Sequence, residues 1–79
     1  MRTDSEIQRD IEDELRWDPS LDNDDIAVAV RDGVVTLAGY VKSYLDKWHA
    51  ERVASRVKGV KAIANDLNVK PVDAHERSG

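Results

Sequence analysis

The sequence predicts an α+β domain with the element order α-β-β-α-β, built as a three-stranded mixed sheet with two helices packed on one face. Three patterns carry this prediction: apolar residues at every fourth position near the N-terminus, an alternating hairpin, and a capped helix that leads into a last apolar strand. Helices and a sheet bury their apolar sides by packing as two layers around one core. We therefore expect both helices to cover the same face of the sheet.

Length and composition set the limits of this domain. A chain of 79 residues with 41% hydrophobic and 35% charged residues forms one small domain, and without cysteine it has no disulfide or thiolate metal site. The longest apolar run, residues 26–30, is too short to span a membrane, and the N-terminus lacks the apolar core of a secretory signal. We therefore expect a cytoplasmic protein as written, with the periplasm as the alternative if a longer product is exported.

The first segment predicts a helix that ends before Asp18-Pro19, because a residue that precedes proline is driven out of the α region. Three apolar residues form a narrow stripe on it: Ile7, Ile11 and Leu15. The candidate N-caps are Thr3, Asp4 and Ser5. Trp17 is assigned to the rim of the core, and the acidic residues 22–25 to a solvated turn.

Residues 26–41 predict a β-hairpin with apolar residues alternating on both sides of Asp32-Gly33. This dipeptide tolerates the positive φ that a two-residue hairpin turn requires, and we expect Gly33 to adopt it. Gly39 lies inside the second strand, where glycine marks a bulge or the close approach of another element. We expect a helix side chain to pack over Gly39.

Ser43 predicts the N-cap of the second helix, with Asp46 placed to complete a weak capping box. Gly59 is expected to end this helix as its left-handed C′ residue. Four apolar residues share the predicted buried face: Ala50, Val53, Ala54 and Val57. Residues 60–69 predict the last strand, which Pro71 terminates.

The hairpin and the last strand carry a resemblance to a known family. The pattern is an alternating apolar string over residues 26–43 with Asp32-Gly33 and Gly39 in register, followed by Gly59-Val60 and Asn65-x-Leu67-x-Val69. It resembles the BON domain (bacterial OsmY and nodulation domain). The resemblance implies an αββαβ fold without catalysis or cofactor, in osmotic- or envelope-stress proteins that associate with phospholipid membranes, often as tandem copies. It assigns residues 1–70 to the domain and residues 71–79 to a disordered tail or inter-domain linker.

The outer face of the second helix is the candidate binding face. Tyr44 and Trp48 lie four residues apart on the side away from the predicted core, where an aromatic ring suits a membrane or protein interface. The bases around them are Lys47, Arg52 and Arg56. Residues 1–25 have a net charge of −7 and residues 42–61 of +4, so an anionic partner should meet this helix.

Two partners fit the binding face. One is an anionic phospholipid surface, and the alternative is another protein, including sister BON domains. A third interpretation is structural, in which one or both rings fold over the rim of the small core. The isolated domain is expected to be monomeric.

Other chemistry finds no support in the residues. His49 and His75 lack a nucleophile and an acid at suitable spacing, and we assign both to the surface. After the acidic residues 22–25, Ile26 and Ala27 stand where a calcium loop needs an oxygen ligand and a glycine. The glycines are too far apart for a phosphate loop. The net charge of −4 and the lack of a GXXG loop both argue against nucleic-acid binding. We expect no catalytic residue, metal, cofactor, nucleic acid or small-molecule substrate.

Overall fold

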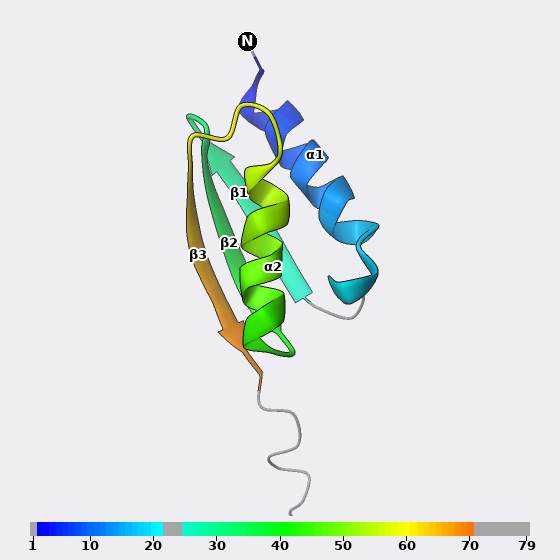
Figure 1. The fold of residues 1–79 in the computed structure, drawn as a ribbon. Helices are drawn as coiled ribbons and strands as arrows, with labels where there is room; N and C mark the ends of the chain where they lie inside the picture. Colours follow the sequence, from blue (N-terminus) through cyan, green and yellow to red (C-terminus); the bar gives the residue numbers. More distant parts are fainter. Residues whose placement is uncertain (1, 22–24, 71–79) are drawn as a thin grey trace, which may run out of the picture.

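The structure of the protein is a computed structural model, and it describes residues 2–21 and 25–70 (Figure 1). In chain order the elements are helix α1 (Asp4–Arg16), the 3-10 turn η1 (Pro19–Leu21), strands β1 (Asp25–Arg31) and β2 (Val34–Val41), helix α2 (Tyr44–Ser55) and strand β3 (Ala62–Val69). The central strand, β2, is antiparallel to β1 and parallel to β3. Both helices lie on one face of this mixed sheet, so the predicted α+β fold is confirmed (Figure 1).

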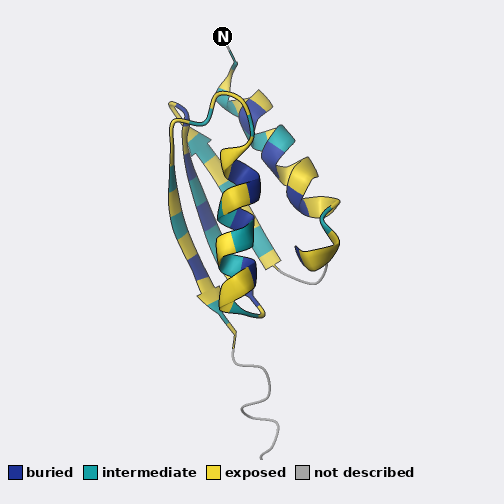
Figure 2. Cartoon of the chain, in the orientation of Figure 1, coloured by how far each residue is buried: buried dark blue, intermediate teal, exposed yellow. Residues whose placement is uncertain are grey.

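The core lies between the helix layer and the sheet (Figure 2). Burial alternates along each strand, because successive side chains of a strand point to opposite faces. The buried apolar residues are Ile7, Ile11, Leu15, Leu21, Val35, Leu37, Val41, Ala50, Val53, Ala54 and Leu67. Helix α2 packs over β2 and β3, while α1 packs against β1 and α2. The stripe predicted for the first helix is therefore the one that it buries.

Helix α1 begins with a capping box. The Thr3 hydroxyl accepts a hydrogen bond from the Glu6 backbone N–H, and the Glu6 carboxylate accepts one from the Thr3 N–H, both at 3.1 Å. The helix ends at Arg16, before Asp18-Pro19 as predicted. Trp17 is 78% exposed, so its assignment to the core rim is wrong. It follows the buried Leu15 by two positions, which on a helix turns a side chain to the opposite side.

The hairpin turn is tied to the first turn of α1. The register of β1 and β2 leaves Asp32 and Gly33 as a two-residue turn, with φ of 53° and 81°, as the sequence predicts. The Asp4 carboxylate accepts hydrogen bonds from the N–H groups of Asp32 at 2.8 Å and Gly33 at 3.1 Å. The Gly33 carbonyl accepts from the Lys61 N–H at 2.8 Å. One turn thus joins α1, the hairpin and the approach to β3.

Gly39 lies against the backbone of the neighbouring strand. Its φ is 122°, and a Cβ at this position would lie 2.1 Å from the Asp25 carbonyl oxygen of β1. The expectation that a helix side chain packs over Gly39 is therefore wrong. The positive φ turns the Cβ direction away from the helix layer and toward β1, so the close approach is between two main chains.

Helix α2 ends earlier than predicted. Its last residue is Ser55 and its C-cap is Arg56, because the Val57 N–H bonds to the Ala54 carbonyl in a tighter, 3-10 type of turn. Gly59 therefore lies beyond the helix and is not its C′ residue, and β3 begins at Ala62 rather than at residue 60. A Cβ on Gly59 would lie 2.8 Å from Ile7 Cδ1, so the chain passes close to α1 here.

At the start of α2, the Ser43 hydroxyl caps the helix by accepting from the Asp46 N–H at 3.2 Å, as predicted. The Asp46 carboxylate, expected to complete a capping box, instead accepts a hydrogen bond from Lys42 Nζ at 2.6 Å. The remaining predictions, an acidic turn at residues 22–25 and a tail at residues 71–79, fall outside the described residues except for Asp25, which opens β1.

The contact between Asp4 and the hairpin turn predicts a measurable loss on mutation. Asp4→Ala should lower the free energy of unfolding by about 1–2 kcal/mol, because two N–H groups lose a charged acceptor. Urea denaturation measures this loss, and the Asp32 and Gly33 amides should exchange faster with solvent. Glu14→Ala, at an exposed acid of the same helix, should change stability by less than about 0.5 kcal/mol. Equal losses in the two variants would contradict the role of Asp4.

The backbone approach at Gly39 predicts a larger loss. Gly39→Ala should destabilise the domain by about 3 kcal/mol or more, because it adds backbone strain to an overlap with a main-chain oxygen. Gly33→Ala is the matched control, at about 1 kcal/mol, because its new Cβ meets the flexible Lys61 side chain at 3.0 Å. Thermal unfolding of both variants tests the order. A Gly39→Ala protein as stable as Gly33→Ala would refute the interpretation.

Candidate functional site

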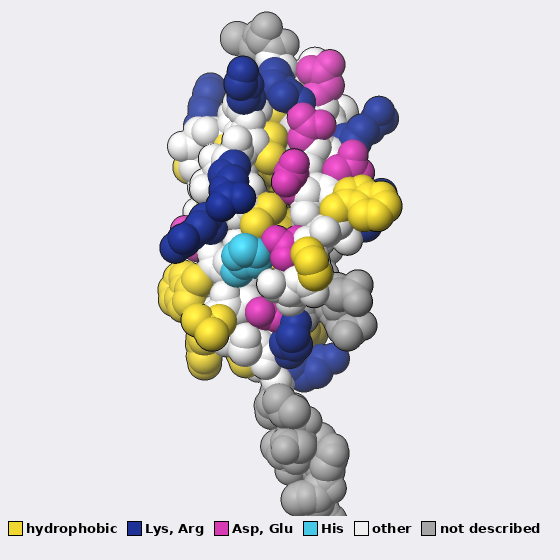
Figure 3. All heavy atoms as spheres, turned by 45° about the vertical axis from the view of Figure 1, so that its right-hand side comes forward, with side chains coloured by type: hydrophobic (Ala, Val, Ile, Leu, Met, Phe, Trp, Pro, Cys, Tyr) yellow, Lys and Arg dark blue, Asp and Glu magenta, His cyan; other side chains and the backbone are white. Residues whose placement is uncertain are grey.

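The outer face of α2 carries a cluster of exposed apolar side chains. Ala50, Val53 and Ala54 face the sheet and are buried, which leaves the opposite side of the helix to solvent. On that side Tyr44 is 66%, Leu45 78% and Trp48 57% exposed. We call these three residues the α2 patch. At the lower left of the view in Figure 3, hydrophobic side chains gather on the surface below several Lys and Arg side chains. The rings of Tyr44 and Trp48 face solvent and are not part of the buried core.

The three predicted bases lie on the same helix or at its end. Lys47 Nζ lies 5.8 Å from the centroid of the Trp48 ring, within the range of a cation–π interaction. Arg52 is exposed on the last turn of α2, and Arg56, also exposed, is its C-cap residue. Within residues 2–21 and 25–70, no acidic side chain forms an ion pair with any of these three bases. Their charge is therefore not neutralised by the neighbouring fold.

Leu45 is the residue of the patch that the predicted site lacks. It is the most exposed of the three and follows Tyr44 directly. The available signal was an apolar residue on the arc of the helix next to Tyr44 and Trp48. From the sequence alone, Leu45 is equally compatible with the buried stripe of the helix. The boundary between the buried and exposed arcs depends on how the helix packs on the sheet.

A pair of titratable groups joins the residue before η1 to α2 beside the patch. His49 Nε2 lies 2.6 Å from Asp18 Oδ2, and the Ser20 N–H donates to Asp18 Oδ1 at 2.9 Å. Burial by itself would raise the pKa of Asp18, but the hydrogen bonds from His49 and Ser20 and the charge of His49 outweigh it and lower that pKa. His49, expected at the surface, is half-buried in this pair.

Lys42 forms a second link between the same elements. Its ammonium group donates to the Ser20 carbonyl and to the Asp46 carboxylate, both at 2.6 Å. A groove between η1 and α2 runs past these contacts, lined by Ser20, Leu45, Asp46, Trp48, His49 and Arg52. The Lys42 contacts and the Asp18–His49 pair hold η1 against α2, so the helix that carries the α2 patch is held in place.

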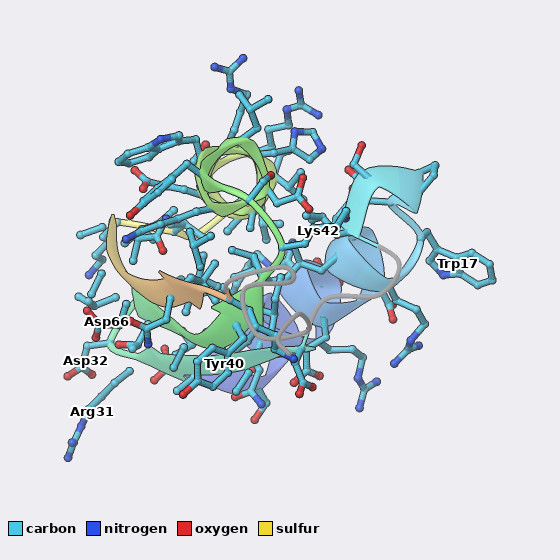
Figure 4. All side chains as sticks on the ribbon, turned by 90° about the horizontal axis from the view of Figure 1, so that it is seen from below. Trp17, Arg31, Asp32, Tyr40, Lys42 and Asp66 are labelled. Atoms are coloured by element: carbon cyan, nitrogen blue, oxygen red, sulfur yellow. The ribbon has the colours of Figure 1, made fainter. Side chains whose placement is uncertain are left out.

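The α2 patch and the three bases form an exposed surface that a partner can contact. Among the described residues, no three His, Cys, Asp or Glu side chains come together in a group that could hold a metal ion. The second exposed tryptophan, Trp17, points outward from the end of α1, well apart from α2 (Figure 4). Aromatic side chains and arginines are enriched on surfaces that meet a partner.

No helix in the described part of the chain is both long enough and apolar enough to cross a bilayer.

Comparison with known proteins gives two findings. The family model of the BON domain matches residues 3–71. The chain is also similar to the osmotically-inducible protein Y of Escherichia coli (strain K12), with 36% identity over 67 residues. This match covers 85% of the chain but 33% of the relative, so the chain spans about a third of that protein's length.

The Asp18–His49 pair predicts how stability varies with pH. Because the pKa of Asp18 lies below its ordinary value of 3.8 in the fold, its ionised form stabilises the protein above about pH 4, and this contribution disappears as the pH falls through the lowered pKa. Asp18→Asn should thus destabilise most above about pH 4 and progressively less below it. Denaturation of both proteins from pH 2 to 7, about the range that spans carboxylate titration, measures the difference. A difference independent of pH would contradict the pairing.

Proposed function

The chain belongs to the BON domain family, and we propose that it serves as a non-enzymatic binding module of an osmotic-stress protein whose α2 patch meets an anionic phospholipid surface. The stress role is supported by the similarity to osmotically-inducible protein Y. Because the chain spans about a third of that relative, we propose this role for a single module and not for a whole protein.

One observation carries the lipid part of the proposal: three exposed apolar side chains adjoin bases that have no acidic partner in the described fold. Tyr and Trp tolerate the boundary between headgroups and acyl chains, because their rings are apolar and their polar atoms stay hydrated. Leu45 adds apolar area that no polar atom interrupts. Burial of this area contributes about 25 cal/mol per Å², and each well-placed base about 1 kcal/mol, near an anionic surface.

The charge of the other helix supports one orientation of the protein on an anionic surface. Helix α1 carries six acids and two bases, whereas α2 carries two acids and two bases and has Arg56 as its C-cap. A negative surface therefore repels α1 and attracts the C-terminal half of α2. The contact should involve α2 with the patch turned toward the membrane and α1 turned away. Such binding is weak at physiological salt, because exposed charges are screened.

The two exposed tryptophans allow a direct test. Trp17→Phe leaves Trp48 as the single emitter, and Trp48→Phe leaves Trp17. With vesicles of phosphatidylglycerol and phosphatidylcholine, the protein that keeps Trp48 should show a blue shift of its emission, and the protein that keeps Trp17 should not. The shift should be lost with phosphatidylcholine alone or in high salt.

The charge requirement has its own matched pair. Arg52→Glu/Arg56→Glu should weaken vesicle binding about tenfold or more, since two favourable contacts become repulsive. Arg9→Glu/Arg16→Glu, which makes the same change of charge on α1, should weaken it far less. A blue shift of Trp17 alone would place the contact on α1. Absence of any shift at low salt would remove the lipid proposal and leave docking on a sister BON domain or another protein.

A further inference from the structure

The face of the sheet opposite the helices is open. In the described structure both helices cover the other face, and the outward positions of the three strands are mostly exposed. In Figure 4, Tyr40 and Arg31 point from the sheet away from the helix layer. Two rows of the sheet lie between them, Ala29–Thr36–Ala64 and Ala27–Ala38–Asp66, and apart from Asp66 on the edge strand these side chains are small.

The ends of this face are complementary to one another about a single row of the sheet. Val28 of β1 pairs with Leu37 of β2, which pairs with Asn65 of β3. Along β1, Asp25 and Arg31 lie at equal distances on either side of this row and both point to the open face. Their charges are opposite, and neither forms an ion pair within residues 2–21 and 25–70.

The central strand shows the same arrangement with apolar residues. Val34 and Tyr40 are the exposed large apolar side chains of the sheet, and they lie at equal distances on either side of Leu37. A rotation of 180° about the row through Val28 and Leu37 exchanges the two ends of every strand. It therefore brings acid to base on β1 and valine to tyrosine on β2.

From this symmetry we propose that a second copy of the chain docks face to face on the open sheet, with the two-fold axis parallel to that row and midway between the two sheets. Asp25 of each copy meets Arg31 of the other, which gives two ion pairs, and Tyr40 of each covers Val34 of the other. The alanines and Thr36 between them let the two sheets approach closely. Asp66, the remaining acid on this face, lies one residue from that row and meets Ala64 of the other copy, and because β3 is an edge strand it stays open to water from the side of the sheet.

The size of the face sets the strength of this dimer. Three strands with about seven residues each cover roughly 14 by 23 Å, or about 330 Å² per copy. The total of about 650 Å² is well below the roughly 1,200 Å² at which specific interfaces begin to be stable. The dimer should thus form only at high concentration, with a Kd of about 0.1–1 mM, and dilute protein should be the monomer that the sequence predicts.

Sedimentation equilibrium of the full chain, from about 10 µM to 2 mM at low salt, measures the dimer at concentrations that span this Kd. Asp25→Arg and Arg31→Asp should each raise the Kd about tenfold, because each replaces two attractive contacts with two repulsive ones. The double variant Asp25→Arg/Arg31→Asp reverses both ends and should restore the Kd of the wild type. Thermal unfolding establishes that each variant remains folded.

Two outcomes would overturn the dimer. One is a protein that stays monomeric up to the highest concentration, and the other is a double variant that associates no better than the single ones. Arg52→Glu/Arg56→Glu is the control, because it changes the α2 face alone and should leave the Kd unchanged. This control also separates the dimer from the lipid proposal, whose failure would not affect self-association.

Discussion

One carboxylate holds together the end of the molecule at which three elements meet. Asp4, in the first turn of α1, accepts hydrogen bonds from both N–H groups of the hairpin turn, and the same turn accepts the backbone N–H that leads into β3. Turn N–H groups that point away from the hairpin have no partner in the sheet, so a charged acceptor from another element is valuable there. This contact sets the height of α1 along β1, and with it the level at which the isoleucines and Leu15 enter the core.

The opposite end is held by different means. The Lys42 ammonium joins the Ser20 carbonyl of η1 to the Asp46 carboxylate of α2, and His49 of α2 pairs with Asp18, the residue before η1. Helix α2 is thereby fixed at its N-terminal half, which is the half that carries Tyr44, Leu45 and Trp48. A rigid base matters for a small apolar patch, because side chains that must be ordered on binding cost conformational entropy.

The sequence predicted what depends on neighbours along the chain. The fourfold spacing of the α1 stripe and the Asp32-Gly33 turn are local and appear as predicted, and the N-cap of α1 is Thr3, one of its three candidates. Gly39, Gly59 and Trp17 depend on how elements meet, and there the predictions failed. Nothing near Gly39 in the sequence shows that β1 passes beside it, and α2 ends early in a 3-10 turn that closes between Ala54 and Val57, before the chain reaches Gly59. Among the site residues, helical spacing predicted which side Tyr44 and Trp48 occupy, whereas the breadth of the exposed arc, and so the place of Leu45, is a matter of tertiary packing.

The close approach at Gly39 also bears on how this chain can change. A side chain that crowds another side chain can be accommodated by a smaller partner, as at Gly33, where a shorter residue in place of Lys61 would relieve the nearest contact, at 3.0 Å, and leave the Gly59 carbonyl oxygen at 3.2 Å. The atom opposite Gly39 is a main-chain oxygen, present whichever amino acid occupies position 25. No second substitution removes it, and only a shift of β1 away from β2 would. Positions of this kind have no compensating partner, so a designer who redraws the surface of the sheet can vary nearly every outward residue but should leave this one alone.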